Sequence, residues 1–442
     1  MSTTHQPADL GVLRFITAGS VDDGKSTLIG RLLYDSKAVL SDQLSALSRA
    51  KNKRTVGEEI DLSLLTDGLE AEREQGITID VAYRYFATAR RKFIIADTPG
   101  HEQYTRNMVT GASTAHAAII LVDATRVSKD DEGRTILLPQ TKRHSAIVKL
   151  LALQHVIVAI NKMDLVEYSE TRFNEIRDAY VELARQLGIS DVRFVPVSAL
   201  KGDNIVQASE RMPWYAGEPL LDVLEQLPVA QAMGEALRFP VQWVARQDGS
   251  SADDFRGYMG RVEAGEVRVG ETIVVLPAKK EATVAEIIAP VPGGTAQVDR
   301  AFAGQTVTLR LSEDVDVSRG DTFVAAQEGQ AAPQPAKKLE ADLCWFDDEP
   351  LSTQRKYLLK QTTTTVFARI GSIKEVLDVH TLSHTSEVHD LKMNDIGRVA
   401  LTLQKPIVCD AYDAQPATGA FVLIDEATHH TVAAGMIRTA FE

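Results

Sequence analysis

Short apolar runs alternate with longer amphipathic segments from Val12 to about Pro228. The runs are rich in Val, Ile and Phe, and they cover residues 12–18, 92–96, 118–122, 155–160 and 193–197. Parallel strands that are covered on both faces have continuous apolar sequences, and the amphipathic segments between them form crossover helices. This part of the chain predicts an α/β domain with a mostly parallel sheet.

The pattern changes after Met233 to short alternating segments punctuated by glycine, as in residues 265–275. Such alternation is typical of half-buried strands in all-β domains. Residues 327–338 are rich in alanine and contain Pro333 and Pro335, so we expect a linker there. The predicted organisation is a P-loop α/β domain over residues 1–233, followed by two all-β barrel domains over residues 234–330 and 339–442.

The composition is that of an ordinary globular protein, with 442 residues of which 44% are apolar and 25% charged. No run approaches the roughly 20 apolar residues of a membrane helix, and the first residues do not resemble a secretion signal, so we expect a cytoplasmic protein. The two cysteines, Cys344 and Cys409, indicate buried, reduced thiols rather than a disulfide framework or a zinc site. The net charge of −13 argues against a broad nucleic-acid-binding face, so no nucleic-acid partner is expected.

A phosphate-binding pattern, Gly-x-x-x-x-Gly-Lys-Ser, follows the first apolar run, and a helix-like segment over residues 26–33 comes next. In this arrangement glycines let backbone amides surround the phosphates, and the helix N-terminus adds positive potential. We expect Lys25 to contact the β- and γ-phosphates as a catalytic group, and the Ser26 hydroxyl to bind Mg²⁺. The expected nucleotide-binding residues are Gly19, Ser20, Val21, Asp22, Asp23, Gly24, Lys25, Ser26 and Thr27.

A second motif, Asp-Thr-Pro-Gly, lies at the carboxyl end of the 92–96 run, where open α/β sheets present their ligand groups. Asp97 is expected to hold Mg²⁺ through water. Gly100 lacks a Cβ, so its N–H can approach the γ-phosphate, and we expect it to be catalytic. The nucleotide-binding residues expected in this motif are Asp97, Thr98, Pro99 and Gly100.

A third motif, Asn-Lys-Met-Asp, follows the 155–160 run. Its aspartate offers two acceptor oxygens to the N1–H and the exocyclic amino group of guanine, a donor pair that adenine lacks. The asparagine is expected to tie the base to the phosphate loop, the lysine to lie along the base, and the residues after the last run to donate a backbone N–H to O6. The base-binding set is Asn161, Lys162, Met163, Asp164, Ser198 and Ala199, and the expected ligand is GTP with Mg²⁺.

Together the three motifs resemble the GTPase core of the translation-factor family. The resemblance extends over the whole chain and implies a GTPase domain followed by two β-barrels. Residues 71–79, Ala-Glu-Arg-Glu-Gln-Gly-Ile-Thr-Ile, resemble the first switch of that family, so Thr78 would ligate Mg²⁺ while the γ-phosphate is present. His101 matches the family's water-positioning histidine, which adds it to the expected nucleotide-binding residues. Both Thr78 and His101 are expected to be catalytic.

Several short sequence segments resemble the GTPase subunit of bacterial sulfate adenylyltransferase more closely than they resemble any translation factor. One distinctive residue is Asp23, where the bacterial tRNA carrier has a histidine. The segments cover residues 20–33, 42–46, 80–86, 101–108, 212–215, 316–321 and 433–437.

That resemblance implies a reaction in which GTP hydrolysis drives an uphill adenylyl transfer. ATP and sulfate give adenosine 5′-phosphosulfate and pyrophosphate, the first step of sulfate assimilation toward sulfide and cysteine. The chain has no second phosphate-loop pattern, which fits a smaller partner subunit that binds ATP and sulfate and performs the transfer in a hetero-oligomer, expected to be a heterodimer. No fused kinase is expected. Residues 125–139 form a longer segment than that family usually has, and their role is left open.

Two other functions compete with this interpretation. One is a translation elongation factor-type GTPase that carries aminoacyl-tRNA, because the nucleotide motifs are the same in both classes. The other is a GTP-binding assembly protein without an enzymatic partner. The aromatic segment over residues 212–217 is expected to be a packed loop rather than a partner surface.

Overall fold

The computed structural model describes residues 11–37, 62, 80–101, 104–229, 236–247, 255–326, 333, 335–378, 381, 383–386 and 388–441. The chain divides near Val229 into two compact units. The predicted domain limits at residues 233 and 330 lie outside the described residues and stay predictions.

The first unit is built on a six-stranded sheet in the order β2-β3-β1-β4-β7-β8. All neighbouring strands are parallel except β2 and β3, which are antiparallel. The five predicted runs are confirmed as the five parallel strands. The strands are β1 (Val12–Ala18), β2 (Ala82–Ala87), β3 (Lys92–Asp97), β4 (Ala117–Asp123), β7 (His155–Asn161) and β8 (Val192–Pro196).

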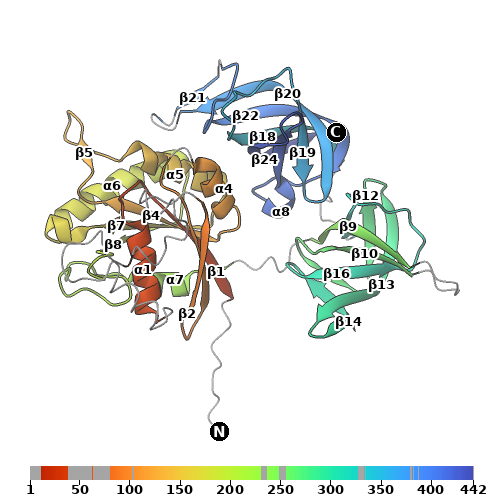
Figure 1. The fold of residues 1–442 in the computed structure, drawn as a ribbon, viewed down its shortest axis with the longest axis horizontal. Coiled ribbons are helices and arrows are strands. Elements are labelled where there is room, and N and C mark those ends of the chain that lie inside the picture. Colours follow the sequence, from red (N-terminus) through yellow and green to blue (C-terminus); the bar gives the residue numbers. More distant parts are fainter. Residues whose placement is uncertain are drawn as a thin grey trace, which may run out of the picture. The chain divides into compact units, whose positions relative to one another are not determined.

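Helices cover both faces of this sheet (Figure 1). Helices α1 and α7 share one apolar core with alternate strand residues such as Phe15, Ile119 and Ile157. Residues of the opposite parity, such as Ile120 and Val158, are also buried, and α4, α5 and α6 contact the sheet. The helices are α1 (Lys25–Asp35), α4 (Thr105–Ala112), α5 (Pro139–Leu150), α6 (Glu170–Leu187) and α7 (Leu220–Gln226).

The limits of α6 follow from its sequence. Ser169 accepts a hydrogen bond from the backbone N–H of Arg172, and Gly188 ends the helix with a φ of 68° that favours glycine. On one side of the helix Phe173 contacts the ring of Trp214, whose indole N–H donates to the Tyr168 carbonyl at 3.0 Å. The aromatic segment therefore packs against the first unit, as predicted.

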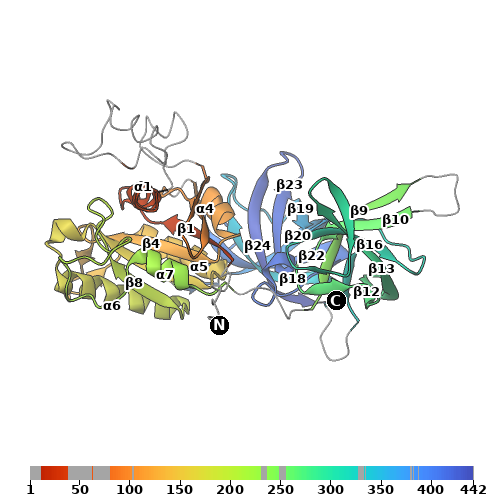
Figure 2. The same ribbon diagram turned by 90° about the horizontal axis from the view of Figure 1, so that it is seen from below.

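The second unit begins with a barrel of six antiparallel strands in the order β12-β17-β9-β10-β16-β13, closed by pairing of β12 with β13. Strand β14 extends β13, and β11 pairs with β15. The ends of β9 and β10 project from the barrel (Figure 2). The strands are β9 (Arg238–Gln247), β10 (Phe255–Arg261), β11 (Glu266–Arg268), β12 (Thr272–Leu276), β13 (Lys280–Val291), β14 (Gly294–Val298), β15 (Arg300–Phe302), β16 (Thr306–Leu311) and β17 (Thr322–Ala325).

A second antiparallel barrel follows in the order β19-β23-β24-β18-β22-β20, closed by pairing of β19 with β20. Its core contains the Cys409 side chain, and both Cys344 and Cys409 are buried thiols, as predicted. The elements are β18 (Pro335–Trp345), β19 (Lys356–Gln361), β20 (Thr364–Leu377), β21 (His384–Thr385), β22 (Ile396–Val408), β23 (Ala420–Asp425), β24 (Thr431–Phe441) and the short helix α8 (Pro416–Gly419).

The linker prediction is wrong at its end, because β18 begins at Pro335. Pro335 and Ala336 pair with Val408 and Ile407 of β22 before a register shift. A proline is tolerated as the first residue of a strand, where its missing N–H removes little from the ladder.

No helix in the described part of the chain is long and apolar enough to cross a membrane.

Candidate functional site

The three sequence motifs come together because they follow neighbouring parallel strands. Thr17 of β1 lies beside Asp97 of β3, and Asp123 of β4 lies beside Asn161 of β7. The carboxyl ends of parallel strands share one edge of a sheet, which is where such folds bind ligands. The phosphate loop, Asp97 and Asn161 are thus placed along one edge.

The phosphate loop is braced by its own residues. Asp23 is fully buried, and its Oδ2 accepts a 2.6 Å hydrogen bond from the Ser20 N–H, while the Asp23 N–H donates to the Ser20 carbonyl at 3.3 Å. Gly24 has a φ of 94° and precedes α1, and a Cβ on it would lie 2.4 Å from Asn161 Nδ2. Only glycine fits this position, so its place in the pattern follows from the geometry.

Lys25 brings a buried ammonium group into the loop. It is 7% exposed, and its Nζ donates to the carbonyls of Gly19 and Ser20, both at 2.9 Å. Burial lowers the pKa of Lys25, against the opposing charges of Asp97, Asp23 and Asp22. Among the described residues no carboxylate forms an ion pair with Lys25, and an ammonium has three N–H donors, so the site suits an anion such as a phosphate.

Gly100 lies directly against the Lys25 ammonium. A Cβ at this position would be 2.4 Å from Lys25 Nζ and 2.8 Å from the Gly19 carbonyl oxygen. The two predicted catalytic groups therefore meet in space.

The predicted magnesium residues belong to the same edge. Asp97 is 2% exposed, and its Oδ1 accepts from Thr17 Oγ1 at 3.3 Å, while Ser26 lies in the first turn of α1. A buried carboxylate and a hydroxyl are hard oxygen donors of the kind that Mg²⁺ prefers, so Ser26 and Asp97 would hold it. When bound, Mg²⁺ would offset the negative charge of the phosphates. Thr78, the third predicted ligand, lies outside the described residues.

The neighbours of these residues differ in exposure. Thr98 is fully buried and its Oγ1 donates to the Thr17 carbonyl at 2.6 Å, and Pro99 is also buried. His101 is exposed, with its ring centroid 6.2 Å from that of Tyr104. In the loop, Asp22 is exposed and Val21 and Thr27 are half-buried.

The predicted base site is joined to the phosphate loop by one side chain. Asn161 donates from Nδ2 to the Asp23 carbonyl at 2.8 Å, and its Oδ1 accepts from the Ala199 N–H at 2.9 Å. Ser198 is fully buried, and its hydroxyl donates to Asp164 Oδ1 at 2.7 Å, which orients that carboxylate. Met163 is buried in the short 3₁₀ helix over Met163–Val166.

Asp123 is a site residue that the motifs did not identify. Its Oδ1 accepts from the Thr125 N–H at 2.8 Å and the Thr125 hydroxyl at 2.7 Å, and its Oδ2 forms a 2.7 Å ion pair with Lys162. Burial would raise the pKa of Asp123, but the bonds from Lys162 and Thr125 outweigh it and hold the pKa below its ordinary value. Its place at the carboxyl end of an apolar run was a signal that could have identified it.

Arg126 was also missed. Its guanidinium donates to the Val21 carbonyl of the phosphate loop at 2.6 Å. This contact joins positions 105 residues apart, and no local pattern in the sequence indicates it.

Two domain families match the chain. Residues 11–229 match the elongation factor Tu GTP binding domain, and residues 338–438 match the GTP-eEF1A C-terminal domain-like family.

Similar solved structures exist along nearly the whole chain. The GTPase-like domain of S. cerevisiae Ski7, bound to GTP, is 15% identical, covers 97% of each chain and has a TM-score of 0.52, a likeness of fold. The structure of sup35 complexed with GDP is 21% identical, covers 98% of this chain and 95% of that chain and has a TM-score of 0.43.

The matched GTP-binding domain and the C-terminal barrel family agree with the observed architecture of a P-loop domain followed by two β-barrels. The phosphate loop, the buried ammonium and the carboxylate edge fit a guanine nucleotide with Mg²⁺. The chain belongs to the translation-factor GTPase superfamily, and its cofactors are GTP and Mg²⁺.

Proposed function

We propose that this chain is the GTP-hydrolysing subunit of a sulfate adenylyltransferase. The observation that carries the proposal is the set of sequence segments that resemble that subunit, above all residues 20–33 with Asp23 in the phosphate loop. Asp23 is a structural part of that loop, because it is fully buried and accepts the Ser20 N–H. The other supporting segments within the described residues are 80–86, 212–215, 316–321 and 433–437.

In the proposed reaction a sulfate oxygen bonds to the α-phosphorus of ATP, and the bond to the departing pyrophosphate breaks. The smaller partner subunit binds ATP and sulfate and performs this step. The chain described here binds and hydrolyses GTP, with Lys25 and the Gly100 N–H at the phosphates and His101 placing the attacking water.

Coupling the two reactions requires a switch element with two states that contact the partner differently. Thr78 and His101 lie on the candidate switch segments. In the proposal their contacts depend on the γ-phosphate, so hydrolysis changes the surface presented to the partner.

A second candidate function is a GTPase that carries aminoacyl-tRNA. The descriptions of both matched families, elongation factor Tu and eEF1A, favour it. The net charge of −13 weighs only slightly against it, because charge distribution matters more for nucleic-acid binding than the total.

The deciding experiment mixes the purified chain with its small partner, ATP and sulfate, and measures pyrophosphate release. With GTP we expect release to be stimulated at least tenfold over GDP or a non-hydrolysable GTP analogue. Lys25→Ala is expected to abolish the stimulation, because it removes the buried ammonium from the phosphate loop. GTP-dependent retention of aminoacyl-tRNA on a filter, with no effect of sulfate, would assign the chain to the carrier class instead.

A further inference from the structure

The turn after β4 places an arginine side chain against the phosphate loop. Asp123 is the last residue of the strand, and the Thr125 N–H and hydroxyl both donate to its Oδ1. An aspartate that bonds the backbone two residues on forms an Asx turn, which sets the direction of the following residue. That residue is Arg126.

One guanidinium nitrogen of Arg126 makes two contacts in the loop. It donates to the Val21 carbonyl at 2.6 Å and lies 3.9 Å from Asp23 Oδ1. In the described part of the chain Asp23 Oδ1 is buried and has no hydrogen-bond partner. Burial raises the pKa of Asp23 to about 6, against the opposing charges of Lys25 and Arg126, so the buried carboxylate lacks full compensation.

The bond to Val21 fixes a peptide unit of the phosphate loop. In a trans peptide the carbonyl of one residue and the N–H of the next point in opposite directions. The Asp22 N–H therefore points away from Arg126. Asp22 has a φ of 69°, a left-handed conformation that a non-glycine residue keeps only when its surroundings hold it.

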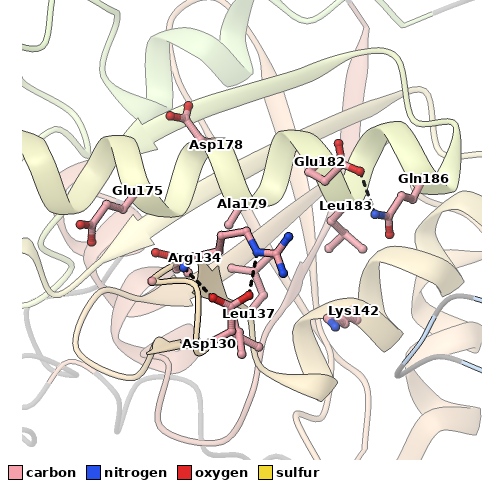
Figure 3. A pocket seen from close by; sticks show the side chains of 13 residues that line it. Asp130, Arg134, Leu137, Lys142, Glu175, Asp178, Ala179, Glu182, Leu183 and Gln186 are labelled. Carbon is pink, nitrogen blue, oxygen red and sulfur yellow. Dashed lines mark hydrogen bonds and ion pairs between the residues drawn. The ribbon is translucent and has the colours of Figure 1, made fainter.

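The segment that follows Arg126 is anchored at a distance from the loop. Residues 128–129 (β5, Ser128–Lys129) and 135–136 (β6, Thr135–Ile136) form a hairpin, and Lys129 pairs with Glu175 of α6 at 2.8 Å. Figure 3 shows Asp130 and Arg134 of the hairpin opposite the α6 side chains, across a cavity of about 680 Å³. The hairpin that follows Arg126 is thus attached to α6.

From this geometry we infer that Arg126 is a positioning residue for the nucleotide: by holding the Val21 carbonyl and facing Asp23, it fixes the Asp22 N–H as a donor to phosphate. The two contacts that carry this inference join Arg126 to the Val21 carbonyl and to the Asp23 carboxylate. The inference needs nucleotide binding but not sulfate activation, so it stands or fails independently of the proposed function.

The test measures dissociation of mant-GDP and mant-GTP from the full chain. Removing a hydrogen bond to a charged group changes an equilibrium by about tenfold or more, so Arg126→Gln is expected to release both nucleotides about tenfold faster. The KM for GTP should rise by a similar factor while kcat stays within about threefold, because the inferred role of the residue is to orient the loop that binds the nucleotide. Arg134→Gln is the matched control, since this hairpin arginine pairs with Asp130, and its release rates should stay within about twofold of the unaltered chain.

A conservative variant separates positioning from general folding. Both observed contacts use a single nitrogen of Arg126, so Arg126→Lys is expected to restore release to within about threefold of the unaltered chain. The inference is overturned if Arg126→Gln releases nucleotide no faster than Arg134→Gln. It is also overturned if Arg126→Lys releases nucleotide as fast as Arg126→Gln, because the positive charge at this position would then not be what orients the loop.

Discussion

The Asn161 side chain donates to the backbone carbonyl of Asp23 at 2.8 Å, joining positions 138 residues apart. The acceptor belongs to the phosphate loop, and the donor belongs to the motif expected to bind the base. The same side chain accepts from the Ala199 N–H at 2.9 Å. One buried amide thus sets the spacing between the phosphate site and both segments of the base site.

Asn161→Asp should separate these two roles. The carboxylate can still accept from Ala199, but its second oxygen faces the Asp23 carbonyl, so two acceptors meet in a buried place. We expect the Kd for mant-GDP to rise at least tenfold with guanine preference retained, measured by fluorescence titration. An affinity within twofold of the unaltered chain would mean that this bond does not hold the two sites together.

Asp164→Asn should change which base is bound. The amide keeps one acceptor oxygen for N1–H but presents a donor where the exocyclic amino group of guanine needs an acceptor. Xanthine has a carbonyl oxygen at that position, so preference should move toward xanthine nucleotides. The measurement is competition of GTP and XTP against mant-GDP. Ser198→Ala is the control: it removes the 2.7 Å bond to Asp164 and should lower affinity severalfold without changing the preferred base. Unchanged guanine preference in Asp164→Asn would remove this residue from the base site.

The sequence predicted the parallel strands and the positions of residues 97 and 161 at their carboxyl ends. This succeeded because a strand covered on both faces must be apolar throughout, and because the groups at residues 97 and 161 follow such runs directly. The glycine positions were equally readable, since Gly24 and Gly100 leave no space for a Cβ.

Other parts of the site depend on contacts between distant positions. The bond from Arg126 to Val21 is created by the turn at Asp123, and neither residue type is unusual at its position. Pro335 was expected to exclude a strand, but its place as the first residue of β18 removes the conflict. Thr78 and the sequence segment over residues 42–46 lie outside the described residues, so the role of Thr78 stays a prediction.

Within the second unit, Arg238 of the first barrel forms a bidentate pair with Asp410 of the second, with both N···O distances 2.9 Å. Arg238 is 7% exposed, and Thr418 also donates to Asp410 at 2.6 Å. Removing one partner of a buried pair leaves an uncompensated charge, at a cost of about 3–5 kcal/mol. Arg238→Met should therefore destabilise the second unit by roughly that amount.

Hydrogen exchange of peptides from β9 and β22 measures this loss. The matched control is Arg256→Met, because Arg256 pairs with Asp314, whose side chain is 89% exposed, and such pairs contribute about 0–1 kcal/mol. Adding Asp410→Asn to Arg238→Met should recover part of the protection, since it removes the charge left behind. Equal exchange in Arg238→Met and Arg256→Met would show that the pair between the barrels contributes little.

His144 should make the first unit less stable in mild acid. It is 1% exposed, and its Nε2 accepts from the Gln140 amide at 2.9 Å, while its Nδ1 has no hydrogen-bond partner among the described residues. Burial, together with the charges of Lys25 and Arg143, lowers the pKa of His144 to about 3. The folded protein therefore keeps this imidazole neutral where the unfolded chain, with a histidine pKa of about 6.5, protonates it.

The direction of this pH effect follows from the number of protons that the folded and unfolded states bind at His144. Between pH 6.5 and about 3 the unfolded state binds more protons at this residue, so the free energy of unfolding falls as pH falls, by about 1.4 kcal/mol per pH unit. Above pH 6.5 the effect vanishes because both states are neutral.

His144→Gln keeps an acceptor for Gln140 and cannot titrate, so it should lose less stability than the unaltered chain between pH 6.5 and pH 5.0, by about 2 kcal/mol. Hydrogen exchange of β4 amides at the two pH values, corrected for intrinsic rates, measures the difference. Identical pH dependence in the two proteins would show that His144 is not neutral in the folded state at pH 5.0.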